Sequence, residues 1–342
     1  MILEQHIRSA LWCVILRKHN LLQRNRSMTV SLGVHIGQQN ISMVELRKLW
    51  KKLDSSGVDW ISLWDHFYEA PYQNGEGDHF EALTTLATLA ADTSHAKIGC
   101  LVFYVGYRNP ALLAKAASTL DHISNGRFEL GIGAGWHIWE ARSYGYAFPD
   151  IGTRLDMLDE AAEIIGRLLQ EPNTTFSGRH FQVDNATCEP KPLQKKMPLW
   201  IGGRGEKKTL EIVARRADGW NAAYVSPSDF LHLNQVLNEW CGEHNREPET
   251  IRRGVNIAFA MATTPQKVKL ERQRLRDQWA NNPAQIESGA LICTPEQAAE
   301  RICEYIDAGA EAVNIALRAP WDEEALEKYL GEVIPEVRKA TL

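Results

Sequence analysis

The chain has 342 residues, a length that favours two domains or one α/β barrel, and its 44% hydrophobic and 24% charged residues are ordinary for a globular protein. The formal net charge of −5 excludes the basic surface by which proteins bind nucleic acid or anionic membranes. Six cysteines without paired spacing, and no HExxH or HxH pattern, predict reduced thiols, a cytoplasmic location and no protein-bound metal.

Residues 1–27 differ from the rest of the chain. They contain the apolar run ALWCVIL with basic residues on both sides, which is too short to span a membrane and precedes no small-residue cleavage site. We therefore expect an N-terminal extension that is not part of the fold, with Met28 as an alternative start. A single domain is expected over residues 28–342.

From Thr29 onward, short apolar runs alternate with segments whose apolar residues recur at helical spacing. Strands are predicted over residues 30–36, 59–65, 96–105, 127–133, 198–203, 218–223, 254–262 and 312–318. Helices are predicted over residues 42–57, 79–94, 109–124, 153–169, 206–217, 227–241, 294–309 and 322–333. Capping signals support two of these helices, namely Asn109 before Pro110 and a Thr-x-x-Gln box that begins at Thr294.

Eight strand–helix units with strands apolar along most of their length predict a (β/α)8 TIM barrel. A doubly wound parallel sheet is the alternative. Two insertions interrupt the alternation. TTFSGRHFQV, residues 174–183, predicts a hairpin with a Ser-Gly turn, and residues 262–293 add helical material that would cover the barrel mouth.

Barrel enzymes place their active sites at the carboxyl ends of the strands. This rule selects Asp65 and His66 after the second strand. Histidine exchanges protons near neutral pH, so His66 beside a carboxylate is a candidate acid or base. The alternative is that the pair only braces its loop.

The stretch GIGAGWHIWE follows the fourth strand and carries Trp136, His137 and Glu140. Trp136 would form a wall for a flat ring, or would simply pack against the core. Arg318 follows the eighth strand. His137 and Arg318 are therefore our candidates for substrate binding.

The stretch IGGRGEKKTL indicates an anion site after the fifth strand. Glycines allow backbone N–H groups to approach an anion closely, and the following helix presents its positive end. The alternative is a tight strand-to-helix turn with solvated cations. The candidate residues are Gly202, Gly203, Arg204, Gly205 and Lys207, with Lys208 next to them.

Four long motifs carry a family resemblance: WISLWDHF, IGCLVFYVGYRNPALLAKAASTLDHISNGRFELGIGAGW, EARSYGYAF and PLWIGGRGEKKTLEIVARRADGWN. With them the chain resembles the bacterial luciferase-like family of flavin and deazaflavin oxidoreductases, above all the branch that depends on coenzyme F420, a 5-deazaflavin. The resemblance implies the same (β/α)8 barrel. We expect a small-molecule substrate, with a homodimer as the candidate assembly.

The resemblance also implies roles for single residues. Asp65 and His66 match the pair beside the reacting edge of the ring. Leu101 and Val102 match a bulge behind the ring that often carries a cis peptide without proline. The remaining matches are Gly135 and Trp136 beside the ring, and Gly202, Gly203, Arg204 and Gly205 around the cofactor phosphate.

Two positions depart from the deazaflavin-linked sugar-phosphate dehydrogenases that the chain resembles. Those enzymes carry a catalytic Glu where this chain has Trp136, and a Trp where it has Ala70. The resemblance therefore argues against sugar-phosphate oxidation. It predicts an F420-dependent hydride transfer with a small organic substrate, in which His66 manages the proton. The alternatives are an FMN-dependent monooxygenase of the same family and a non-catalytic flavin-binding protein.

Overall fold

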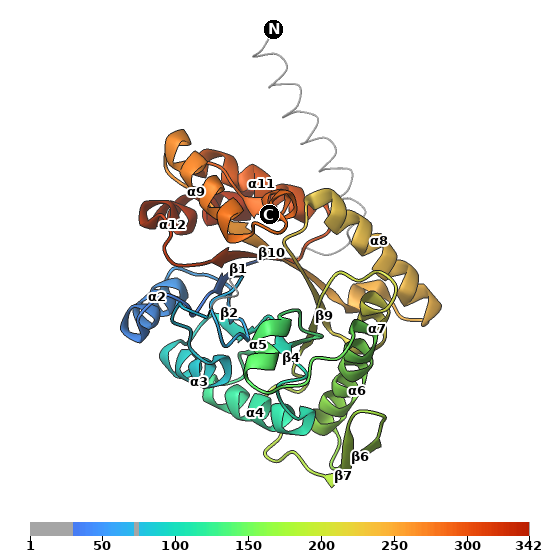
Figure 1. Cartoon of the computed structure of the whole chain (residues 1–342). Coiled ribbons are helices and arrows are strands. Elements are labelled where there is room, and N and C mark those ends of the chain that lie inside the picture. Colours follow the sequence, from blue (N-terminus) through green and yellow to red (C-terminus); the bar gives the residue numbers. More distant parts are fainter. Residues whose placement is uncertain (1–29, 72–74, 342) are drawn as a thin grey trace.

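The computed structural model describes residues 30–71 and 75–341, so the predicted extension over residues 1–27 lies outside the described residues. Eight parallel strands form a closed ring, and helices surround it (Figure 1). The predicted (β/α)8 barrel is therefore confirmed, and the doubly wound sheet is excluded. The barrel strands are β1 (Ser31–Ile36), β2 (Trp60–Leu63), β3 (Lys97–Cys100), β5 (Phe128–Gly133), β8 (Leu199–Gly202), β9 (Gly219–Ala223), β10 (Arg252–Phe259) and β12 (Ala312–Leu317).

The ring closes because β1 pairs with both β2 and β12, while β10 pairs with both β9 and β12. Inside it, the rings of Trp60 and Trp200 lie 4.7 Å apart and fill the space below the mouth. Gly219 packs against these rings, and a Cβ there would lie 2.3 Å from the Trp200 ring. The interior at the level of these two rings is thus a packed core and not a channel.

The helices form the outer layer, and their apolar faces cover the strands. The predicted cap of one helix is present, since the Asn109 side chain accepts a hydrogen bond from the Ala111 backbone at 2.9 Å. The helices that follow the barrel strands are α2 (Met43–Ser55), α3 (Ala82–Asp92), α4 (Pro110–Ile123), α6 (Ile151–Gln170), α7 (Thr209–Arg216), α8 (Pro227–Glu243), α11 (Pro295–Asp307), and α12 (Glu323–Lys328) with α13 (Ile334–Thr341).

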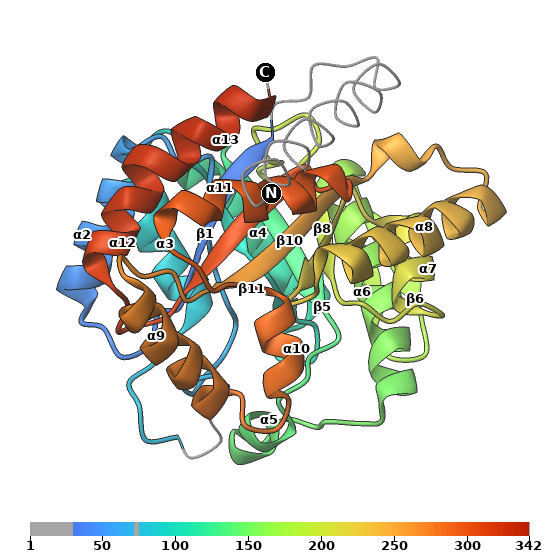
Figure 2. The ribbon, with the colours of Figure 1, turned by 90° about the horizontal axis from the view of Figure 1, so that it is seen from above.

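Both predicted insertions are present. β6 (Thr174–Ser177) and β7 (Gln182–Ala186) form the antiparallel hairpin. α9 (Pro265–Gln278), α10 (Pro283–Ser288) and the short β11 (Ala290–Leu291) lie between β10 and α11. Figure 2 shows α9 and α10 at the same end of the barrel as a further short helix, α5 (Ile138–Ser143).

Several predicted segments differ from the structure, three of them directly after barrel strands. The glycine stretch after β5 contains α5, where the sequence analysis predicted no helix. α7 begins at Thr209, three residues later than the predicted start at 206, because residues 206–208 form a turn. The strand predicted over 96–105 divides into β3 and β4 (Phe103–Tyr104), and the Leu101–Val102 peptide between them is cis, as the resemblance implied.

Two further properties of the described residues concern membrane-spanning helices and cysteines. No helix within residues 30–71 and 75–341 combines the length and the apolar character needed to cross a membrane. Five cysteines fall in this part of the chain, and all are buried free thiols: Cys100, Cys188, Cys241, Cys293 and Cys303.

Candidate functional site

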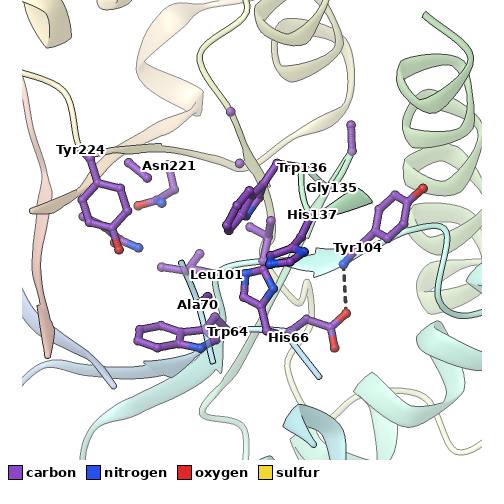
Figure 3. Close-up of a pocket in the computed structure, with 18 of the residues that line it drawn as sticks. Trp64, His66, Ala70, Leu101, Tyr104, Gly135, Trp136, His137, Asn221 and Tyr224 are labelled. Carbon is purple, nitrogen blue, oxygen red and sulfur yellow. Dashed lines mark hydrogen bonds between the residues drawn. The ribbon is translucent and has the colours of Figure 1, made fainter. Parts of the chain in front are cut away.

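A cavity of about 470 Å³ opens at the carboxyl ends of the strands, where the barrel rule places an active site (Figure 3). Loops from around the ring contribute to its lining. Eleven of the predicted site residues line it: Asp65, His66, Leu101, Val102, Gly135, Trp136, His137, Gly202, Gly203, Arg204 and Arg318. Gly205 and Lys207 are exposed and do not contribute to the lining.

His66 is held by Glu140 across the cavity wall. The His66 Nδ1 atom lies 3.1 Å from the Glu140 carboxylate, and only 13% of the His66 side chain is exposed. This contact occupies Nδ1 and leaves Nε2 as the nitrogen available for a ligand. The sequence analysis placed Asp65 beside His66 as its partner. The structure corrects this expectation, since the carboxylate that orients the imidazole comes from α5.

Glu140 is fully buried and accepts three further hydrogen bonds. The Tyr107 hydroxyl donates to it at 2.6 Å, and the backbone N–H groups of Phe67 and Tyr68 donate at 2.8 and 3.3 Å. Burial alone would raise the pKa of Glu140, but the donors, with His66 first, outweigh burial and lower the pKa to about 2. Glu140 is therefore ionised at neutral pH.

Asp65 belongs to a second network. Its carboxylate accepts from the Tyr104 backbone at 3.1 Å, the dashed line in Figure 3, and from Arg108 at 2.7 Å. Arg108 also donates to Glu81 at 2.6 Å. Burial raises the pKa of Asp65, and the Arg108 guanidinium and the Tyr104 N–H oppose that rise. Asp65 thus joins the loops after β2 and β3.

Asp65→Asn should lower the free energy of unfolding by about 1–2 kcal/mol, because it removes the ion pair with Arg108 and leaves that guanidinium with Glu81 as its remaining partner. Urea unfolding at pH 7 measures the change. Glu327→Gln is the control, since Glu327 forms an exposed ion pair with Lys52 and should contribute about 0–1 kcal/mol. Equal losses in the two variants would contradict a bracing role for Asp65.

Aromatic rings form the roof of the cavity. Trp136 is 50% exposed, and its ring lies 5.2 Å from the His66 ring and 6.4 Å from the ring of Trp279 at the end of α9. The insertion after β10 therefore contributes Trp279 to the site. Trp279 also lies 5.3 Å from Tyr224, which follows β9. The sequence analysis named neither residue.

The glycine loop after β8 lies at the edge of the cavity. Gly203 has a φ of +137°, and a Cβ there would lie 2.9 Å from the Thr209 side chain, so the position requires glycine. Of the three predicted cations, Lys208 is paired with Asp156 and Lys207 lies outside the lining. Arg204 lines the cavity and forms no ion pair within 4 Å with any described residue.

The remaining groups fit a flat ring with polar edges. Five lining residues hold a buried polar atom without a hydrogen-bond partner in the described part of the chain: Asp65 Oδ1, Tyr104 Oη, Asn221 Oδ1, Trp279 Nε1 and Arg318 Nε. Burying such atoms without a partner is costly, so a ligand with matching polar edges would stabilise them. The Val102 side chain packs against glycines of the lining. A Cβ at Gly133 would lie 2.5 Å from the Val102 side chain.

Comparison with known proteins finds sequence similarity over most of the chain. Residues 25–312 match the sequence profile of the family described as luciferase-like monooxygenase. The F420-dependent glucose-6-phosphate dehydrogenase of Kineococcus radiotolerans is 26% identical over 339 residues, which cover 90% of this chain and 97% of that protein.

Two solved structures share the fold at lower identity. An F420-dependent secondary alcohol dehydrogenase in complex with an F420–acetone adduct superposes with a TM-score of 0.80 at 20% identity, covering 91% of this chain and 99% of the other. The oxygenating constituent of 3,6-diketocamphane monooxygenase from Pseudomonas putida, in complex with FMN, superposes with a TM-score of 0.70 at 16% identity, covering 91% and 99%.

Proposed function

Because this chain belongs to the luciferase-like monooxygenase family, we propose that it is an F420-dependent oxidoreductase acting on a small organic substrate. A bound deazaflavin supplies a carbon that accepts or donates a hydride. Relatives named for F420 support this cofactor, among them the dehydrogenase of K. radiotolerans. The observation that carries the proposal is the His66–Glu140 pair inside a cavity with unpartnered polar atoms.

His66 is the proposed acid or base. Glu140 holds its Nδ1, so Nε2 accepts the proton of a substrate hydroxyl during oxidation and returns it during reduction. Buried Glu140 also stabilises the imidazolium that forms, as a carboxylate does beside a catalytic histidine. Tyr107 keeps its proton, since burial and Glu140 raise its pKa, and it serves to hold the carboxylate.

The ring would lie between Val102 and the residues around Trp136, with Asp65 and Asn221 at its polar edges. Trp136 and Ala70 both line the cavity at the positions where sugar-phosphate dehydrogenases carry Glu and Trp. We therefore propose a substrate other than a sugar phosphate. The cofactor phosphate would bind at residues 202–205 with Arg204.

Arg204→Gln should weaken binding of F420 by about tenfold, since one charge-assisted contact to a phosphate contributes about 1–2 kcal/mol. The deazaflavin core that lacks the phosphate should bind with unchanged affinity. Fluorescence titration of both ligands measures the two constants. Lys208→Gln is the control, because Lys208 is already paired with Asp156. Equal weakening of both ligands in Arg204→Gln would contradict the phosphate assignment.

The choice of cofactor is tested by titrating F420 and FMN against the purified protein and then following turnover. Tight F420 binding with reduction by simple alcohols supports the proposal. Oxygen consumption with reduced FMN would instead assign an FMN-dependent monooxygenase. Tight ring binding without turnover of any substrate would assign a flavin-binding protein.

A further inference from the structure

Arg318 stands out among the groups that line the cavity. It follows β12, and its guanidinium carbon lies 4.7 Å from the ring centroid of Trp64 and 5.4 Å from that of Tyr224. The ring of Trp279 lies 5.6 Å away. The Tyr224 hydroxyl accepts a hydrogen bond from Nη2 at 2.6 Å, while Nε is buried without a partner. Three aromatic rings and one hydroxyl thus fix the guanidinium at the cavity.

Among the described residues, no carboxylate forms an ion pair with this cation. Its hydrogen bond to Tyr224 is the only polar contact that it makes with a described residue. Glu271 of α9 borders a small hollow next to Arg318, but Glu271 is paired with Arg274 at 2.6 Å. The His35 ring lies 5.0 Å from that of Trp64, and the pKa of His35 is lowered to about 3 by burial and then by Arg318 and His66. His35 is therefore neutral.

A half-buried cation without a counter-ion is poorly compensated, even where aromatic faces attract it. An anionic group of a ligand would supply the missing charge and a partner for Nε. Guanidinium presents its N–H groups as a planar fork that matches a planar carboxylate. We propose that Arg318 binds a carboxylate group of the substrate, and that the substrate is a small organic acid.

The position of Arg318 suits one substrate that also reaches His66. The Trp279 ring lies 5.6 Å from the Arg318 guanidinium carbon and 6.4 Å from the Trp136 ring. The Trp136 ring in turn lies 5.2 Å from the His66 ring. In Figure 3, Tyr224 and Trp64 lie at the left of the cavity, and His66 and His137 lie to the right of them. The substrate carboxylate would bind at Arg318, beside Tyr224 and Trp64. The reacting carbon of the substrate would lie near His66. That the bound acid is the substrate rests on the proposed function.

The test uses matched pairs of small acids and their amides, from propionate and propionamide to 3-phenylpropionate and 3-phenylpropionamide. Calorimetry on the full chain at pH 7.5 should show that at least one acid binds at least about tenfold more tightly than its amide. Arg318→Gln should remove this preference by weakening the acid alone. Arg276→Gln is the matched control, because Arg276 forms an exposed pair with Glu287 and lies outside the cavity lining.

Two further variants keep the test informative if Arg318→Gln folds poorly. Arg318→Lys retains the charge without the fork and should lose most of the preference for acids, whereas Tyr224→Phe should lose only part of it. The proposal is overturned if acids and amides bind equally, if neither binds, or if Arg318→Gln keeps the preference. Inorganic phosphate binding more tightly than every acid would overturn the carboxylate assignment.

These binding measurements require neither cofactor nor turnover. A failure of the acids to bind would leave F420-dependent turnover of neutral substrates possible to observe. Conversely, absence of hydride transfer with F420 would leave a measured acid preference at Arg318 unchanged. The two proposals therefore fail separately.

Discussion

His66→Ala is expected to lower turnover by at least about a hundredfold, because a positioned general acid or base typically contributes a factor of about 10²–10⁴. Cofactor affinity should change little, since we propose that residues 202–205, and not His66, bind the cofactor phosphate. The loss should appear in kcat more than in KM, because proton transfer takes place in the transition state.

Steady-state kinetics, a cofactor titration and a thermal melt on the same preparation measure these three effects. His95→Ala is a control, since the His95 side chain is 77% exposed and remote from the cavity lining. If His66 only braced the loop after β2, His66→Ala would melt earlier and keep its turnover per folded molecule. Full activity of the folded fraction would end the acid–base assignment.

Replacing Glu140 should have the largest effect on stability. Glu140→Ala leaves the Tyr107 hydroxyl, two backbone N–H groups and His66 without their buried acceptor. Removing one partner of such a buried network costs about 3–5 kcal/mol of unfolding free energy. Glu140→Gln keeps one oxygen acceptor and should cost less. Both variants should lose turnover, since neither can hold and charge-stabilise the imidazole of His66.

The pH dependence of the unfolding free energy distinguishes the contribution of the negative charge of Glu140 from that of its shape. The pKa of Glu140 is lowered from its ordinary 4.5 to about 2, so ionised Glu140 stabilises the fold fully above about pH 4.5. This stabilisation is lost as the pH falls toward 2. Urea unfolding between pH 6 and 2.5 should therefore show a shallower acid decline for Glu140→Gln than for the unaltered chain. Parallel declines would contradict the low pKa.

Much of the barrel was predictable because each strand is a short apolar run between turn residues. The prediction of a continuous strand over 96–105 was wrong, since no propensity in the sequence marks the break at Leu101. That feature came from the family resemblance. α5 was missed because six residues after a glycine turn give too short a pattern for helical periodicity.

The sequence indicated which loops contribute residues to the candidate site, but not which of these residues contact one another. The barrel rule selected His66 and Arg318 at strand ends, and both line the cavity. It could not pair His66 with Glu140, which lies 74 residues further along the chain. The insertion over residues 262–293 was expected to cover the mouth, but its sequence does not show that Trp279 is the side chain that reaches the cavity, because this depends on tertiary packing.

The closure of the barrel also sets an order of events during synthesis. β12 is the last strand, and it fills the place between β1 and β10 by pairing with both. Until residues 312–317 have left the ribosome, the nascent chain keeps two unpaired strand edges, the kind of surface that associates with other chains. Arg318 follows directly, so the last residue to reach the cavity is also the one that we assign to the substrate carboxylate. A stalled or truncated chain that lacks residues 312–318 would therefore tend to associate with other chains and could not bind the substrate carboxylate.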